Sequence, residues 1–211
     1  MIKLERGLFI VLEGPDGSGK STVAEFMAEY LKDKGHEIEF SREPGGTNIG
    51  EKIREIILDV KNEEMSSEAE ALLYAASRAQ HVTEKIKPTI DSGKDLICER
   101  FYYSSLVYQG IGRKLGVDVV KSFNEFAIQG VYPDLVIFLD VDPEKALKRK
   151  KDTENLDRLE NEKISFHKEV FNGYKEIIRI SPEIKVVDAD RRKDEIYEDV
   201  KKLINNILER V

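Results

Sequence analysis

Residues 8–22, LFIVLEGPDGSGKST, decide the fold of this 211-residue chain. The stretch begins with five apolar residues, LFIVL, which are typical of a strand buried on both faces. From Ser21 the apolar residues recur at helical spacing until Gly35 ends the pattern. A buried strand, a glycine-rich turn and a helix in this order indicate the opening unit of an α/β fold.

The rest of the chain continues this alternation. Strands are predicted at residues 38–40, 95–98, 134–139 and 185–187. Helices are predicted at residues 48–59 and 67–87, and Ser67 followed by Glu70 has the spacing of a capping box. Residues 148–155, KRKKDTEN, are predicted to form an exposed loop. Because helices separate the strands, we expect one α/β domain over residues 1–211, with an open, mostly parallel sheet of about five strands covered by helices on both faces.

Composition excludes several classes of protein. Acidic residues outnumber basic ones, 41 to 34, and the formal charge of −7 disfavours nucleic-acid or membrane-surface binding, which needs a basic face. The first apolar run is far shorter than the ~18 residues of a membrane span, and no signal-peptide cleavage site follows it. Cys98 is the only cysteine, and the three histidines are too scattered to form a metal site with it. We therefore expect a cytoplasmic protein with no membrane or nucleic-acid partner.

Residues 14–21, GPDGSGKS, match the phosphate-binding pattern G-x-x-x-x-G-K-[ST] and lie between the predicted strand and helix. The glycines let backbone N–H groups surround phosphate oxygens, Lys20 adds a positive charge, and the Ser21 hydroxyl is a ligand for Mg²⁺. The alternative is a glycine turn that only caps the helix. We predict a P-loop NTPase fold in which a nucleoside triphosphate is bound by Gly14, Pro15, Asp16, Gly17, Ser18, Gly19, Lys20, Ser21 and Thr22.

Three further segments each contain an arginine: residues 42–47 (REPGGT), 74–78 (YAASR) and 99–110 (ERFYYSSLVYQG). Arg42 and Arg100 directly follow predicted strands. The carboxyl ends of parallel strands face one crevice, so both arginines should converge near Lys20 and hold a second phosphate. For any single arginine, the alternative is a solvated surface position. The guanine-reading pattern Asn-Lys-x-Asp is missing from the sequence, which argues against a regulatory GTPase.

Together these segments resemble the thymidylate kinase family. The resemblance rests on LEGPDGSGKST (12–22), REPGGTNIGEKIR (42–54), LLYAASRAQHV (72–82), ERFYYSSLVYQG (99–110), PDLVIFLDVDPEKALKRK (133–150) and DRLE (157–160). It implies phosphorylation of dTMP to dTDP in dTTP biosynthesis, by direct in-line transfer from ATP with Mg²⁺ as cofactor. It also implies a homodimer that contacts ATP and dTMP as its small-molecule substrates.

The resemblance implies how the phosphate and sugar of dTMP are held. Arg42 and Arg100 would hold the phosphate, and Asp16 would hold the 3′-hydroxyl. Tyr108 would lie where the 2′-hydroxyl of a ribose would project, and would thereby select the deoxy sugar.

It also implies how the base is recognised. Tyr74 would stack on the thymine ring, and Arg78 would donate a hydrogen bond to its O4. Gln109 or Ser105 would contact the base edge. Taken alone, Tyr74 also fits a core aromatic residue on an apolar helix face.

The remaining implied residues belong to the reaction centre and to a short mobile lid at residues 149–160. The P-loop has no arginine between Asp16 and Lys20, and family members of this kind supply basic residues from the lid instead. Arg158 matches the lid position and is implied to be a catalytic residue. Arg149 resembles the arginine that packs on adenine. Glu99 stands where the family usually has aspartate, and its longer carboxylate would orient Mg²⁺-bound water or position the acceptor phosphate. The alternative for residues 148–151 is a purely structural role, as a basic helix end that complements the helix dipole.

Two other functions remain as alternatives. One is another nucleotide or nucleoside kinase of the same fold, against which Tyr74, Arg78, Tyr108 and Gln109 argue together. The other is a nucleotide sensor without catalytic activity, for which the P-loop would suffice. A sensor has no need of the arginines at positions 42, 100 and 158.

Overall fold

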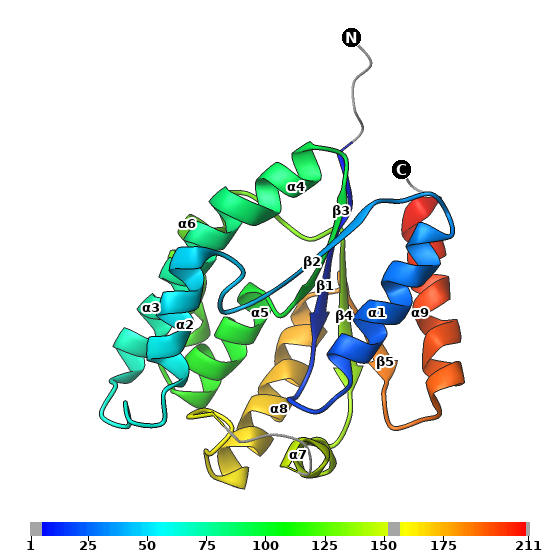
Figure 1. The fold of residues 1–211 in the computed structure, drawn as a ribbon. Coiled ribbons are helices and arrows are strands. Elements are labelled where there is room, and N and C mark those ends of the chain that lie inside the picture. Colours follow the sequence, from blue (N-terminus) through cyan, green and yellow to red (C-terminus); the bar gives the residue numbers. More distant parts are fainter. Residues whose placement is uncertain (1–5, 152–156, 210–211) are drawn as a thin grey trace.

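The computed structural model describes residues 6–151 and 157–209. Its centre is a five-stranded sheet with the strand order β2-β3-β1-β4-β5, in which every neighbouring pair is parallel (Figure 1). The strands are β1 (Phe9–Glu13), β2 (Ile38–Arg42), β3 (Asp95–Glu99), β4 (Leu135–Asp140) and β5 (Ile184–Asp188). The predicted α/β class, the strand number and the parallel pairing are confirmed.

Helices cover both faces of the sheet (Figure 1). Alternation along β1 explains this, because Phe9 and Val11 belong to one buried core while Ile10 and Leu12 belong to the other. The second core includes residues of α1 (Lys20–Lys32), α7 (Pro143–Lys151) and α9 (Lys193–Leu208). The first includes residues of α2 (Asn48–Leu58), α4 (Lys87–Asp91), α5 (Tyr102–Ser105), α6 (Val117–Ile128) and α8 (Ile164–Ile180), and the π-helical segments Val82–Ile86 and Leu106–Gly112.

The helix predicted at residues 67–87 differs from the prediction in two ways. It is α3 (Ser67–His81), followed by the π-helical segment and α4. Its N-cap is Ser66, whose hydroxyl accepts from the backbone N–H of Ala69 at 3.2 Å, so the capping box predicted from Ser67 is wrong. Glu70 does not reach back to the helix start, because its buried carboxylate binds Gln109, Arg113 and Arg158.

The loop predicted at residues 148–155 is also partly wrong. Residues 148–151 form the end of α7, and residues 152–155 lie outside the described ranges. Ala146 and Leu147 anchor this helix in the core, and Lys148, Arg149 and Lys150 complement its carboxyl-terminal dipole. Across the described ranges, no helix combines the length and the apolar character needed to cross a membrane.

Candidate active site

The P-loop joins β1 to α1 at the carboxyl edge of the sheet. Gly19 precedes the helix with φ of 93°, and no described side chain caps the first turn, so the N–H groups there are available to an anion. A Cβ at Gly17 would lie 2.0 Å from the carbonyl oxygen of Ala146, so the turn requires glycine. Ser18 Oγ is buried and has no hydrogen-bond partner among the described residues. These features fit a phosphate group.

Lys20 lies inside the loop rather than in solvent. Its Nζ donates to the carbonyl oxygens of Gly14 and Pro15 at 3.2 and 2.9 Å, and lies 3.8 Å from Asp16 Oδ1. Burial, followed by the charge of Arg100, lowers the pKa of Lys20 to about 8. The ammonium is therefore held in a position where an incoming anion would stabilise its charge.

Arg100 brings the loop after β3 to the P-loop. Its guanidinium donates to Asp16 Oδ1 at 2.9 Å, Ser104 Oγ at 3.0 Å, Tyr108 OH at 3.2 Å and Tyr174 OH at 3.3 Å. Burial raises the pKa of Asp16, but the charges of Arg100 and Lys20 outweigh it and hold that pKa well below its usual value. Asp16 is therefore an ionised partner that orients Arg100.

Glu13, which the sequence analysis did not single out, fixes this loop. Arg100 has φ of 66°, a left-handed conformation that costs a residue with a Cβ about 1 kcal/mol. The buried carboxylate of Glu13 accepts from Phe101 N at 2.9 Å, Ser104 Oγ at 2.6 Å and Tyr174 OH at 2.8 Å. These bonds hold the strained turn in place. An acidic residue at the end of an otherwise apolar strand was the available signal.

A pocket beside the P-loop gathers all the residues predicted for the acceptor. Its lining includes Asp16, Arg42, Tyr74, Arg78, Arg100, Ser105, Tyr108 and Gln109. Burial raises the pKa of Tyr74 and of Tyr108, so both hydroxyls stay protonated at neutral pH. The structure thus brings these side chains to one pocket, while the task of each remains a prediction.

A second pocket lies over the P-loop. Its lining is Asp16, Gly17, Gly19, Lys20, Ser21, Thr22, Glu99, Arg149 and Lys150. Four of these residues also line the acceptor pocket: Asp16, Lys20, Glu99 and Lys150. The two pockets therefore adjoin, with two cations and two carboxylates at their boundary.

Arg42 and Arg54 lie together at the acceptor pocket. Arg42 forms a two-point ion pair with Glu51, with both contacts at 3.0 Å. Both arginines donate to the carbonyl oxygen of Pro44, at 3.1 and 2.9 Å. Burial and the charge of Arg42 lower the pKa of Arg54, which the sequence analysis missed although it ends the matching segment 42–54. The site thus has a second cation, Arg54 on α2, beside Arg42 at the end of β2.

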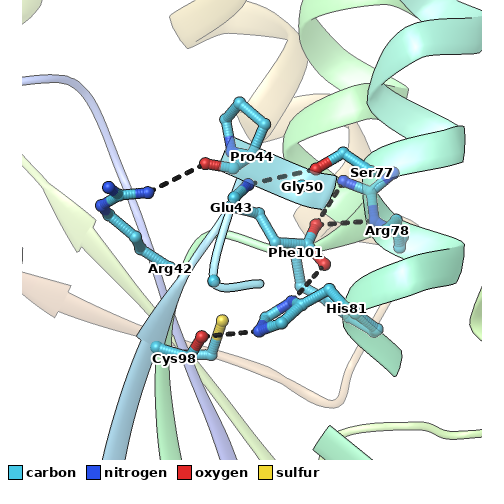
Figure 2. A network of polar contacts seen from close by, with 12 residues as sticks. Arg42, Glu43, Pro44, Gly50, Ser77, Arg78, His81, Cys98 and Phe101 are labelled. Carbon is cyan, nitrogen blue, oxygen red and sulfur yellow. Dashed lines mark hydrogen bonds and ion pairs between the residues drawn. The ribbon is translucent and has the colours of Figure 1, made fainter. Parts of the chain in front are cut away.

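Arg78 is buried, lines the acceptor pocket and contacts Glu43 (Figure 2). Its Nε and Nη2 lie 2.7 and 2.6 Å from Glu43 Oε2, and its Nη1 donates to Ser105 Oγ at 3.0 Å and to Asn124 Oδ1. One N–H of Nη2 has no hydrogen-bond partner among the described residues and remains for a ligand. Sequence reasoning missed Glu43 and Asn124 because nothing in their spacing shows that they meet Arg78.

Arg158 lines neither pocket, although its neighbours Asp157 and Leu159 line the acceptor pocket. Its Nη2 is 2.7 Å from Glu70 Oε2, and its Nε donates to the carbonyl oxygen of Ile57 at 2.8 Å. Lys150, at the end of α7, lines both pockets and forms an ion pair with Glu160. The structure thus brings Lys150, rather than the arginine predicted from sequence, to the boundary between the pockets.

Comparisons with known proteins agree with this arrangement. The family model described as thymidylate kinase matches residues 12–200. A thymidylate kinase of Finegoldia magna is 50% identical over 190 residues, covering 90% of this chain and 94% of that protein. Thymidylate kinases of Clostridium novyi and Halothermothrix orenii are 46% and 48% identical, over 94% and 92% of this chain and 98% and 95% of their own lengths. The chain belongs to the thymidylate kinase family.

Proposed function

We propose that this protein transfers the γ-phosphoryl group of ATP to dTMP, giving ADP and dTDP. The observation that carries this function is the junction of the two pockets at Lys20 and Glu99. The pocket over the P-loop, called the donor pocket from here on, suits a triphosphate. The acceptor pocket beside it offers arginines to a second phosphate and aromatic rings to a base. Family membership supplies the identity of donor and acceptor.

The reaction needs no covalent enzyme intermediate. A phosphate oxygen of dTMP, already ionised at neutral pH, attacks the γ-phosphorus, and the bond to the β–γ bridging oxygen breaks as ADP leaves. Arg42 and Arg100 align the acceptor phosphate, while Lys20 neutralises charge that develops on the donor. Catalysis here is placement together with charge neutralisation.

The oxygen donors at the junction fit Mg²⁺. The ion, when bound with ATP, neutralises charge on the β- and γ-phosphates. Ser21 and Glu99 line the donor pocket and supply a hydroxyl and a carboxylate. Within the described ranges no group of three or more metal-ligating side chains occurs, so the substrate phosphates and water would complete the coordination.

Base and sugar recognition follow from the acceptor pocket. The remaining N–H of Arg78 would donate to thymine O4, Tyr74 would stack on the ring, and Gln109 or Ser105 would contact the base edge. Tyr108 would exclude a 2′-hydroxyl. Asp16 would hold the 3′-hydroxyl while it orients Arg100.

For the lid, the geometry favours Lys150 over Arg158. Lys150 already lines both pockets, whereas Arg158 must first leave Glu70 and Ile57 to reach the phosphates. Arg149 lines the donor pocket, where packing against adenine remains its proposed task.

A homodimer and a cytoplasmic location complete the proposal. Large apolar side chains are exposed at Ile56 on α2, Leu72 on α3 and Phe126 on α6. Helix α3 packs against both of the other helices (Figure 1). Such a surface suits a second copy of the chain. Sedimentation equilibrium measures that association.

The activity is tested by measuring ADP release with ATP and a panel of nucleoside monophosphates. We expect dTMP to give the highest kcat/KM, with dUMP, dCMP and AMP below it. A clear preference for another monophosphate would identify a different kinase of the same fold. ATP binding without turnover on any acceptor would support a nucleotide sensor.

A further inference from the structure

Buried polar contacts link Arg78 through Glu43 to His81 (Figure 2). Glu43 Oε2 contacts Arg78, and Glu43 Oε1 lies 3.0 Å from His81 Nδ1. His81 Nε2 lies 2.6 Å from Ser41 Oγ. His81 has an exposed fraction of 0%, Arg78 of 1% and Glu43 of 4%, so water does not complete these bonds.

The direction of the hydrogen bonds assigns a task to His81. A carboxylate oxygen only accepts, so His81 Nδ1 is the donor to Glu43. In the described part of the chain, no other side chain donates to Glu43 Oε1. Because Oε2 is already taken by Arg78, the imidazole fixes the rotation of the carboxylate that aligns the guanidinium.

His81 also contacts the loop after β2. A Cβ at Gly46 would lie 2.7 Å from His81 Nε2 and 2.5 Å from Ser41 Oγ, so the imidazole packs directly on this turn. The next residue back, Gly45, donates its N–H to Ser77 Oγ at 3.1 Å. The same helix thus holds the turn that separates Arg42 from α2, and Arg42 itself bonds the Pro44 carbonyl oxygen within it.

His81 lines neither pocket, but its partner Glu43 lines the acceptor pocket and its partner Ser41 directly precedes Arg42, which also lines that pocket. We propose that His81 is a positioning residue for the acceptor: it orients Glu43, which aligns Arg78 toward the base, and it supports the turn beside Arg42. The inference rests on the proposed role of Arg78 in base recognition. It extends that role to a buried histidine that touches no substrate.

The decisive comparison is between His81→Leu and His81→Asn. Leucine keeps much of the volume but removes the donor, whereas the asparagine amide can donate from the position of Nδ1. For His81→Leu we expect the KM for dTMP to rise about 10-fold and the preference for dTMP over dCMP to narrow by a similar factor, because a misaligned Arg78 distinguishes O4 from an amino group less well. The KM for ATP and kcat should stay within about 3-fold of the unmodified protein, since the P-loop is untouched. His81→Asn should recover most of the loss.

A matched control is available in the same sheet. His36 also pairs through Nδ1 with a carboxylate, Asp95 Oδ2 at 2.8 Å, but at the amino end of β3. His36→Leu should leave the dTMP parameters unchanged. If His81→Leu fails to fold, Ser41→Ala removes the partner of Nε2 and should raise the KM for dTMP in the same direction but less.

Four outcomes would overturn the inference. Equal increases in the KM values for dTMP and ATP would show a general structural role. If His81→Asn raised the KM for dTMP as much as His81→Leu, the hydrogen bond that His81 donates to Glu43 would be excluded as the cause. If His81→Leu left the KM for dTMP unchanged while Arg78→Met raised it, His81 would have no part in positioning the acceptor, and the base-reading role of Arg78 would stand. An unchanged KM in Arg78→Met would instead overturn that role, and this inference with it.

Discussion

The donor and acceptor pockets adjoin at Lys20 and Glu99, yet they are built from different parts of the chain. The donor pocket is mostly one contiguous segment, in which glycines and an uncapped helix start present backbone N–H groups. The acceptor pocket depends on ion pairs between distant segments, such as Arg100 with Asp16 and Arg78 with Glu43. A triphosphate can be bound by local backbone geometry, whereas recognition of a base requires side chains that other side chains hold in place.

The largest expected effect comes from the donor side. Lys20→Ala should lower kcat by ~10²-fold or more, because the ammonium neutralises charge that grows in the transition state. Because burial lowers the pKa of Lys20, its ammonium is less stable in the folded protein than in the unfolded chain, so we expect no loss of thermal stability in this variant. Steady-state kinetics and thermal unfolding measure turnover and stability.

Lys32→Ala, at the exposed far end of the same helix, is the control and should change neither. Near-normal turnover in Lys20→Ala would remove the P-loop lysine from the mechanism.

The same contrast explains what the sequence could and could not predict. The strands and the P-loop are local patterns, so the runs at residues 8–12 and 134–139 and the glycines of residues 14–19 were sufficient to place them. Convergence of Arg42 and Arg100 followed from parallel topology, since both flank the carboxyl edge of the sheet. Glu43 with His81, and Glu70 with Arg158, are pairs separated by 38 and 88 positions, and nothing in either local pattern reveals them.

The second prediction tests the lid, where the sequence and the structure favour different residues. Lys150→Ala should lower kcat on the order of 10- to 100-fold, because its charge lies at the junction of the pockets. Arg158→Ala should change kcat less and raise both KM values a few-fold, because it removes a bond between the lid and α3. Single-turnover phosphoryl transfer with both substrates saturating separates these effects.

Lys148→Ala is the matched control, since this neighbouring lysine is exposed and lines neither pocket. A large loss in Arg158→Ala with normal chemistry in Lys150→Ala would restore the assignment made from sequence, and would require Arg158 to leave Glu70 on closure.

The third prediction concerns sugar selection. The guanidinium of Arg100 lies over the ring of Tyr108, 5.1 Å from the ring centroid, and donates a hydrogen bond to the Tyr108 hydroxyl. Tyr108→Ala should narrow the preference for dUMP over UMP about 10-fold by removing the ring, whereas Tyr108→Phe should keep that preference. Comparing dUMP with UMP holds the base constant. If the phenylalanine variant lost selectivity as fully as the alanine variant, the hydroxyl and its bond to Arg100 would control the sugar instead.

The smallest effect is a pH dependence confined to the donor side. Because the pKa of Lys20 is about 8 in the folded protein, kcat/KM for ATP should fall above pH 8, by about fourfold between pH 7 and pH 8.5. Bound phosphates stabilise the ammonium, so kcat itself should stay flat to higher pH. The titration of Lys20 does not cause unfolding in this pH range. In the unfolded chain the lysine pKa is near 10.5, so the unfolded chain binds more protons than the folded protein between pH 8 and 10.5. Lys20 therefore makes the folding stability rise with pH in that window. A simultaneous fall of kcat/KM for ATP and of melting temperature above pH 8 would assign the loss to another group, and a fall in kcat/KM for dTMP alone would place the titration on the acceptor side.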